Sequence, residues 1–137
     1  MLRTLDISAS GLVAQRLRMD TIAGNIAHSH TTMNEQGQPS PFQRRLVVLE
    51  AATKQQDRSG RGTAVQATVE TDTQTLPRRI HDPGHPHADK QGYVSYPNIN
   101  VITEFVNAVE ATRAYEANIS TMRVTRDMID STFRLLG

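Results

Sequence analysis

The stretch from Val101 to Leu136 decides the fold, and it reads VITEFVNAVEATRAYEANISTMRVTRDMIDSTFRLL. One row of residues recurs in it every seven positions: Val101, Ala108, Tyr115, Met122, Ile129 and Leu136. A second row lies four positions further on: Phe105, Thr112, Ile119, Arg126 and Phe133. A four-three spacing held over such a length is typical of a left-handed coiled coil. Because neither glycine nor proline interrupts the stretch, it is predicted to form one helix of roughly 54 Å.

This helix needs a partner, because it is too long for the rest of the chain to enclose as a compact core. The segment from Leu5 to Ala27 offers one. It contains no proline and repeats an apolar row every seven residues: Leu5, Leu12, Met19 and Ile26. The segment is predicted to form an amphipathic helix of roughly 35 Å. We expect the two helices to pair as a coiled coil through these rows.

The C-terminal rows contain two polar exceptions, Thr112 and Arg126. Two interpretations of Arg126 stay open. In the first, its aliphatic stem packs in the seam while its charged end reaches water. In the second, it pairs with an acid on a neighbouring helix and fixes the register of the coiled coil.

The residues between the two helices have a different character. Their glycines and prolines predict a loop over 28–41 and a polar, glycine-rich turn over 55–63. Alternating and β-branched residues predict extended segments at 42–50 and 65–69. Further short extended segments are expected at 78–81, before Asp82-Pro83-Gly84, and at 93–96, after Gly92. Pro97 then ends the last segment, and Asn98 or Asn100 is expected to cap the C-terminal helix.

The predicted fold is therefore mainly α-helical with a small β-rich insert. Residues 1–30 and 98–137 are expected to form the helical coiled-coil unit, and residues 31–97 the β-rich and loop insert. Hydrophobic residues make up 37% of the 137 residues, with three phenylalanines, three tyrosines and no tryptophan. Such a core is thin, so much of the apolar burial should come from neighbouring molecules. We expect a subunit of an assembly.

Composition excludes several other classes of protein. The 15 lysines and arginines are scattered among 14 acids, so no patch for nucleic acid or an anionic membrane is visible. The absence of cysteine rules out disulfides and thiolate metal sites. No apolar run is long enough for membrane insertion, and no cleavable leader is recognisable at the N-terminus. Export, if it occurs, should use a route that reads no cleaved signal.

One segment has side chains suited to metal binding, the run HDPGHPHAD with His81, His85 and His87. Imidazole and carboxylate groups are ligands that zinc accepts. The two prolines and the glycine favour a rigid surface loop with solvated histidines instead. No nucleotide-binding loop, nucleophile elbow or metalloprotease motif is present. We therefore expect no enzyme activity, no cofactor and no small-molecule substrate, and keep a metal-dependent enzyme centred on these histidines as an alternative.

Several motifs resemble those of a known family. In the N-terminal helix they are Ala9-Ser10-Gly11-Leu12, Gln15-Arg16 and Asn25-Ile26-Ala27. These resemble the shared N-terminal signature of the axial proteins of the bacterial flagellum, which form its rod, hook and hook-associated parts. Further motifs resemble the proximal rod proteins of that family: Asp82-Pro83-Gly84-His85-Pro86 and Arg113-Ala114-Tyr115-Glu116-Ala117-Asn118. His28 departs from the pattern, since the family usually has a second asparagine there.

The resemblance implies a structural subunit of the proximal rod, the drive shaft for motility that crosses the periplasm within the flagellar basal body. Its partners would be other copies of the chain, other rod proteins and the flagellar type III export apparatus. The terminal helices would line the inner tube and the insert would face outward. The two seam rows and the N-terminal row would then carry the assembly contacts. A soluble coiled-coil adaptor or chaperone-like binding module remains the alternative, because heptads alone would suffice for it.

Overall fold

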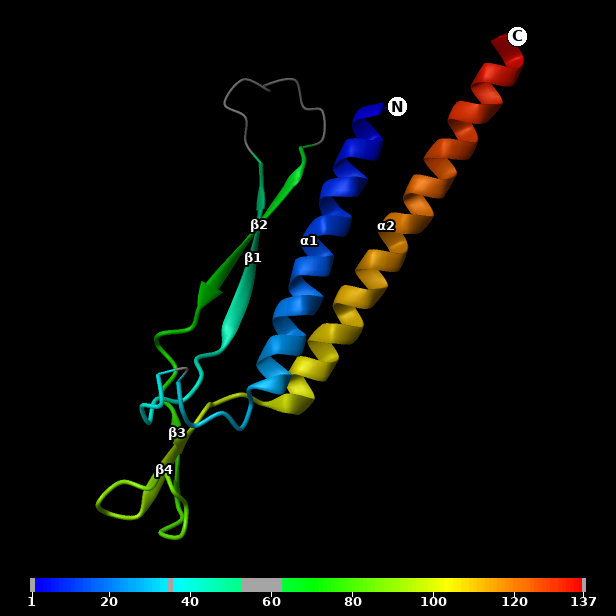
Figure 1. The fold of residues 1–137 in the computed structure, drawn as a ribbon. Helices are drawn as coiled ribbons and strands as arrows, with labels where there is room; N and C mark the ends of the chain where they lie inside the picture. Colours follow the sequence, from blue (N-terminus) through cyan, green and yellow to red (C-terminus); the bar gives the residue numbers. More distant parts are fainter. Residues whose placement is uncertain (1, 35, 53–62, 137) are drawn as a thin grey trace.

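A computed structural model describes residues 2–34, 36–52 and 63–136. Along the chain its elements are α1 (Leu2–Ala27), β1 (Arg45–Ala51), β2 (Val65–Thr71), β3 (Arg78–His81), β4 (Tyr93–Tyr96) and α2 (Val101–Leu136). Figure 1 shows the two helices running antiparallel, with α1 between α2 and the β1–β2 hairpin. The β3–β4 hairpin lies beyond the end where α1 finishes and α2 begins. A mainly helical fold with a small β-rich insert, as predicted, is confirmed.

The helix ends have clear local causes. Asn100 caps α2, because its Oδ1 accepts hydrogen bonds from the backbone N–H groups of Ile102 and Thr103 at 3.0 and 3.3 Å. At the end of α1, the N–H of His28 donates to the carbonyl of Gly24 at 3.0 Å. The ring of His28 also stacks on Phe42 at 4.7 Å, which ties the helix end to the following loop. α1 thus ends at Ala27, directly before the histidine that departs from the family pattern.

The strands form two separate antiparallel pairs rather than one sheet. In the first pair Arg45 lies opposite Thr71 and Ala51 opposite Val65. In the second, Arg78 lies opposite Tyr96. The predicted segments 78–81 and 93–96 coincide with β3 and β4, whereas the predicted strand at 42–50 begins late, at Arg45. The glycine-rich turn predicted for 55–63 lies, apart from its last residue, outside the described residues.

The buried interior is small and unusually polar. Its fully buried hydrophobic residues are Ala14, Ile22, Val94 and Ala111. Its buried polar and charged residues are Ser8, Asn25, Thr32, Glu104 and Thr125. The large apolar side chains of α2 lie mostly outside this interior. Apolar burial within one chain is thus limited, as the composition predicts.

The loop before β4 is held by one carboxylate. Oδ1 of Asp89 accepts the N–H groups of Gln91 and Tyr93 at 2.8 and 2.9 Å, and Oδ2 accepts a hydrogen bond from Arg79 at 2.6 Å. These donors, the Tyr93 N–H foremost, lower the pKa of Asp89 below its ordinary value of 3.8. Gly92 beside it has a φ of +78°, which favours glycine.

The lowered pKa of Asp89 predicts how the loop before β4 responds to acidic pH. The charged carboxylate stabilises the loop at pH values above 3.8, and this contribution is lost as the pH falls through the lower, folded pKa. The amide resonance of Tyr93 should therefore titrate by NMR with a midpoint below 3.8. In Asp89→Asn that titration should vanish. A wild-type midpoint at or above 3.8 would contradict the assignment.

Candidate assembly interface

The face of α2 that contacts α1 includes the first predicted row and only part of the second. Val101, Ala108, Tyr115, Met122 and Ile129 are half-buried, as a seam requires, and the side chain of Leu136 lies outside the described part. In the second predicted row only Ile119 is half-buried, whereas Phe105, Thr112, Arg126 and Phe133 are exposed. Within one chain, Phe105, Arg126 and Phe133 therefore lie outside the helix contact, whereas the hydroxyl of Thr112 donates to Met19 Sδ of α1 at 3.6 Å.

The true second row lies three residues after the first, not four. It consists of Glu104, Ala111, Asn118 and Thr125, of which all but the half-buried Asn118 are fully buried. These residues are small or polar, so a search for hydrophobic side chains passes over them. Their seven-residue repeat was nevertheless present in the sequence and could have been found by looking for small residues.

Arg126 does not fix the register of this helix pair. Its side chain is 80% exposed, and its Nε lies 4.0 Å from Asp130, one turn along the same helix. Within the chain Arg126 thus pairs with its own helix, and the hypothesis that it pairs with an acid on a neighbouring helix stays a prediction for contacts with other molecules. An exposed pair of this kind contributes little to stability.

Other cross-helix contacts set one antiparallel register. Asn25 Nδ2 donates to Glu104 Oε2 at 3.0 Å, and Arg18 forms an ion pair with Glu110 at 3.3 Å. Further along, Asn118 packs directly over Gly11, where an added Cβ would lie 2.9 Å from Asn118 Nδ2. A shift of either helix by one turn would break all of these contacts together.

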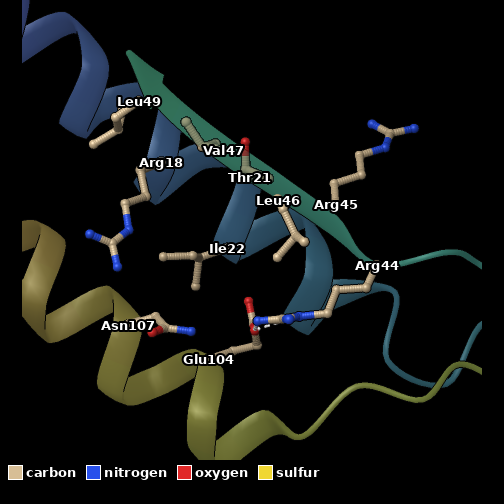
Figure 2. Close-up of a pocket in the computed structure, with 10 residues that line it drawn as sticks. All are labelled: Arg18, Thr21, Ile22, Arg44, Arg45, Leu46, Val47, Leu49, Glu104 and Asn107. Atoms are coloured by element: carbon tan, nitrogen blue, oxygen red, sulfur yellow. Dashed lines mark hydrogen bonds and ion pairs between the residues drawn. The ribbon is translucent and has the colours of Figure 1, made fainter. Parts of the chain in front are cut away.

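Glu104 stands at the centre of this arrangement, with only 1% of its surface exposed. Its second oxygen, Oε1, accepts hydrogen bonds from Nε and Nη2 of Arg44, the residue before β1 (Figure 2). The amide of Asn25 in turn pairs with the backbone of Arg45, accepting from its N–H at 2.9 Å and donating to its carbonyl at 2.8 Å. This Asn25–Glu104–Arg44 cluster joins α1, β1 and α2.

A hollow of about 390 Å³ lies beside the cluster, between β1 and the two helices (Figure 2). Its apolar lining includes Ile22, Leu46 and Leu49. Two of its charged side chains, Arg44 and Glu104, bind each other, and Arg18 pairs with Glu110. These charges are thus already engaged in holding elements together rather than available to a ligand.

The histidine-rich loop also has structural contacts. His87 Nδ1 lies 2.9 Å from the hydroxyl of Thr32, which is buried in the loop after α1. His85 Nδ1 accepts the backbone N–H of His87 at 3.1 Å, and the His81 ring meets Tyr93 edge-on at 5.0 Å. Among the described residues no group of three or more histidines or acids is placed to hold a metal. The motif anchors the β3–β4 hairpin, and the part played by Thr32 was not foreseen.

The family-like motifs divide into two groups. Ser10, Gly11 and Asn25 make contacts within the chain; the Ser10 hydroxyl, for example, accepts the N–H of Val65 at 2.9 Å. In contrast, Arg113 and Glu116 are exposed on α2. Arg113 and Glu116 therefore make no contribution to the buried interior.

Comparison with known proteins identifies the family. A family profile described as "Flagellar basal body rod FlgEFG protein C-terminal" matches residues 90–135. The flagellar basal-body rod protein FlgC of Aquifex aeolicus is 39% identical over 129 residues, covering 94% of this chain and 92% of its own length. The chain belongs to the FlgC family.

Other FlgC proteins support the same conclusion. The one from Bacillus subtilis is 35% identical over 137 residues, covering 92% of this chain and 91% of that protein. The one from Salmonella typhimurium is 33% identical over 135 residues, covering 98% and 97%. As far as its described residues go, this FlgC-family chain has no helix with the length and apolar character of a membrane span.

The Gly11–Asn118 contact predicts opposite effects of alanine at the two glycines of α1. Gly11→Ala should force Asn118 out of the seam and destabilise the chain by about 1 kcal/mol. Gly24→Ala, where nothing lies within 4 Å of the added Cβ, should stabilise α1 by about 0.5–1 kcal/mol. Urea unfolding followed by circular dichroism measures both. Adding Asn118→Ala should remove most of the cost of Gly11→Ala; equal effects at the two glycines would refute the packing argument.

The Asn25–Glu104–Arg44 cluster predicts that Glu104→Gln destabilises the folded chain, although glutamine has nearly the same shape as glutamate. The new amide must turn its NH₂ toward either Asn25 Nδ2 or Arg44, and both of these are donors. We expect a loss of about 1–3 kcal/mol in the free energy of unfolding.

Glu110→Gln is the matched control, because Glu110 is also a glutamate of α2 in an ion pair but is 62% exposed. Its cost should be about 0–1 kcal/mol. If urea unfolding gave similar losses for the two variants, the buried cluster would contribute no more to stability than an exposed ion pair.

Proposed function

We propose that this protein is a structural subunit of the flagellar basal-body rod that assembles with other rod proteins, and with copies of itself, into a helical drive shaft for motility. The observation that carries the proposal is its membership of the FlgC family over more than nine-tenths of its length. Within the rod we assign it to the proximal part, next to the membrane ring.

The fold suits such a role, because the folded chain leaves much apolar surface for neighbours. Phe105 and Phe133 are exposed although both are large and apolar. The residues proposed for assembly contacts are Leu5, Leu12, Met19, Ile26, Val101, Phe105, Ala108, Tyr115, Ile119, Met122, Arg126, Ile129, Phe133 and Leu136. Those that are half-buried within one chain would be covered further by neighbouring helices.

The helical unit, residues 1–30 and 98–137, is proposed to form the inner tube wall, with residues 31–97 facing outward. The antiparallel contact between α1 and α2 supports this division, because the helices join one another directly while the β1–β2 hairpin lies on the far side of α1 (Figure 1). We further propose that α1 and α2 pack as a coiled coil through the three-four rows of α2. Delivery through the flagellar export apparatus completes the proposal.

Electron microscopy of isolated basal bodies tests the function. Cells of the source bacterium that make only residues 1–100 should form the membrane ring but no rod or hook, because α2 is missing. Cells that make the full chain are the control. Intact, rotating flagella in the truncated strain would reject the rod assignment and favour the soluble adaptor.

A further inference from the structure

The β3–β4 hairpin rests on the loop that follows α1, residues 28–34 and 36–41. Within the part of the chain that the structure describes, neither strand packs against α1, α2 or the β1–β2 hairpin (Figure 1). Val94 of β4 is nevertheless fully buried, and it lines a hollow of about 290 Å³ together with Thr32 and Pro39 of the loop. A hollow of this size shows that the junction between the loop and the hairpin is not closely packed.

A chain of two hydrogen bonds crosses this junction. The buried hydroxyl of Thr32 lies 2.9 Å from Nδ1 of His87. The backbone N–H of His87 in turn donates to Nδ1 of His85 at 3.1 Å, and the two imidazole rings meet edge-on with their centroids 5.1 Å apart. His85 therefore positions the residue that bonds to the loop after α1.

This arrangement requires the neutral form of His85. Its Nδ1 accepts the His87 N–H through a lone pair, and both ring nitrogens of a protonated imidazole are donors. A proton on His85 Nδ1 would therefore face the His87 N–H, donor against donor. The bond between His87 and Thr32 is less sensitive by itself, because a hydroxyl can donate or accept.

The other titratable groups around His85 do not replace the lost acceptor. On the same loop, the carbonyl of Asp82 accepts the His85 N–H at 3.2 Å, and from β4 the Tyr96 ring meets the His85 ring edge-on at 6.2 Å. None of the acids that the structure describes forms an ion pair with His85. Arg78 and Lys90 are exposed, and the remaining groups of the hairpin and the loop after α1 have other contacts: Arg79 with Asp89, His81 with Tyr93, His28 with Phe42 and His30 with Ser29.

We propose that protonation of His85 releases the β3–β4 hairpin from the loop after α1. Imidazole is the side chain whose charge ordinarily changes between about pH 5 and 8, so the junction holds in neutral solution and opens in mild acid. The hairpin then moves on its two linkers, residues 72–77 and 97–100, while the contacts between α1 and α2 remain. This device goes beyond the rod function, because it makes the orientation of part of the insert depend on pH.

Distances between two spin labels on the full chain test the release. Because the chain has no cysteine, labels can be attached at Ala23→Cys on α1 and Lys90→Cys in the hairpin loop, both of which are exposed. At about pH 8 the distance distribution should contain one narrow population. At about pH 5 that population should fall by about threefold or more in favour of a broad one. Circular dichroism should show the same helix content at both pH values, because the helices keep their contacts.

Replacing His85 by asparagine provides the decisive variant. Asparagine carries Oδ1 at the position of Nδ1 in histidine, so it can accept the His87 N–H, and it does not titrate. In His85→Asn the narrow population should persist at both pH values. The matched control is His30→Asn, since His30 is an exposed histidine of the loop after α1 that contacts Ser29 and not the hairpin. This control should respond to pH as the wild type does.

Amide resonances of the wild-type chain give an independent measurement that needs no variant at His85. The His87 amide should move upfield between about pH 8 and 5, because its hydrogen bond is lost. The Tyr93 amide should not move over this range, since it donates to Asp89, whose pKa lies below its ordinary value of 3.8.

The outcomes decide the proposal without involving the rod function, because every measurement is made on the chain in solution. A loss of the narrow population that His85→Asn abolishes and His30→Asn retains supports the release. An unchanged distance distribution down to about pH 5, or a response that persists in His85→Asn, overturns it. If His85→Asn does not fold, the His87 amide decides: a stationary resonance overturns the proposal, and a shift without a shift of Tyr93 supports it.

Discussion

The carboxylate of Glu104 is the group on which the rest of the arrangement depends. It is removed from water, and an isolated buried charge would be strongly unfavourable. Asn25 satisfies one of its oxygens and Arg44 the other, so α1 and the start of β1 must both be in place around α2. Because the Asn25 amide is itself held by the backbone of Arg45, it can present only its NH₂ group to the carboxylate. The chain thus has one way to bring these elements together.

Buried polar groups between two helices lower the stability of the pair but restrict the helices to one alignment. Hydrophobic rows allow helices to slide by a turn at modest cost, whereas buried polar pairs are satisfied in one alignment alone. In this chain the most buried positions of α2 include Glu104 and Thr125, the apolar residues Tyr115, Met122 and Ile129 are half-buried beside them, and many other large apolar residues of α2 are exposed. The folded subunit therefore has a defined shape but a thin core, and its exposed apolar residues are available to the assembly.

Sequence patterns predicted the elements better than the contacts. The heptad stretch located α2 at its observed bounds, and the turn residues Asp82-Pro83-Gly84 and Gly92 helped to locate β3 and β4, because these signals are local. The second seam row was assigned to Phe105 and its repeats because burial was equated with hydrophobicity. Asn25 was assigned to a family motif and to the polar face of its helix, whereas it is buried and bonds to Glu104, 79 positions away. No local sequence pattern predicts such a long-range contact. The contacts of Arg44 with Glu104 and of Thr32 with His87 also join distant residues and could not be predicted for the same reason.

Because Asn25 and Glu104 lie 79 positions apart, their contact also forms late when the chain folds. A chain that becomes available from its N-terminus presents α1 long before Glu104, so α1 has neither its helical partner nor its buried carboxylate. Closing a loop of this length is slow compared with forming a helix turn. The N-terminal hundred residues therefore cannot complete the native interior by themselves. A chain with this topology therefore remains incompletely folded, and able to pass through a narrow channel, until α2 becomes available.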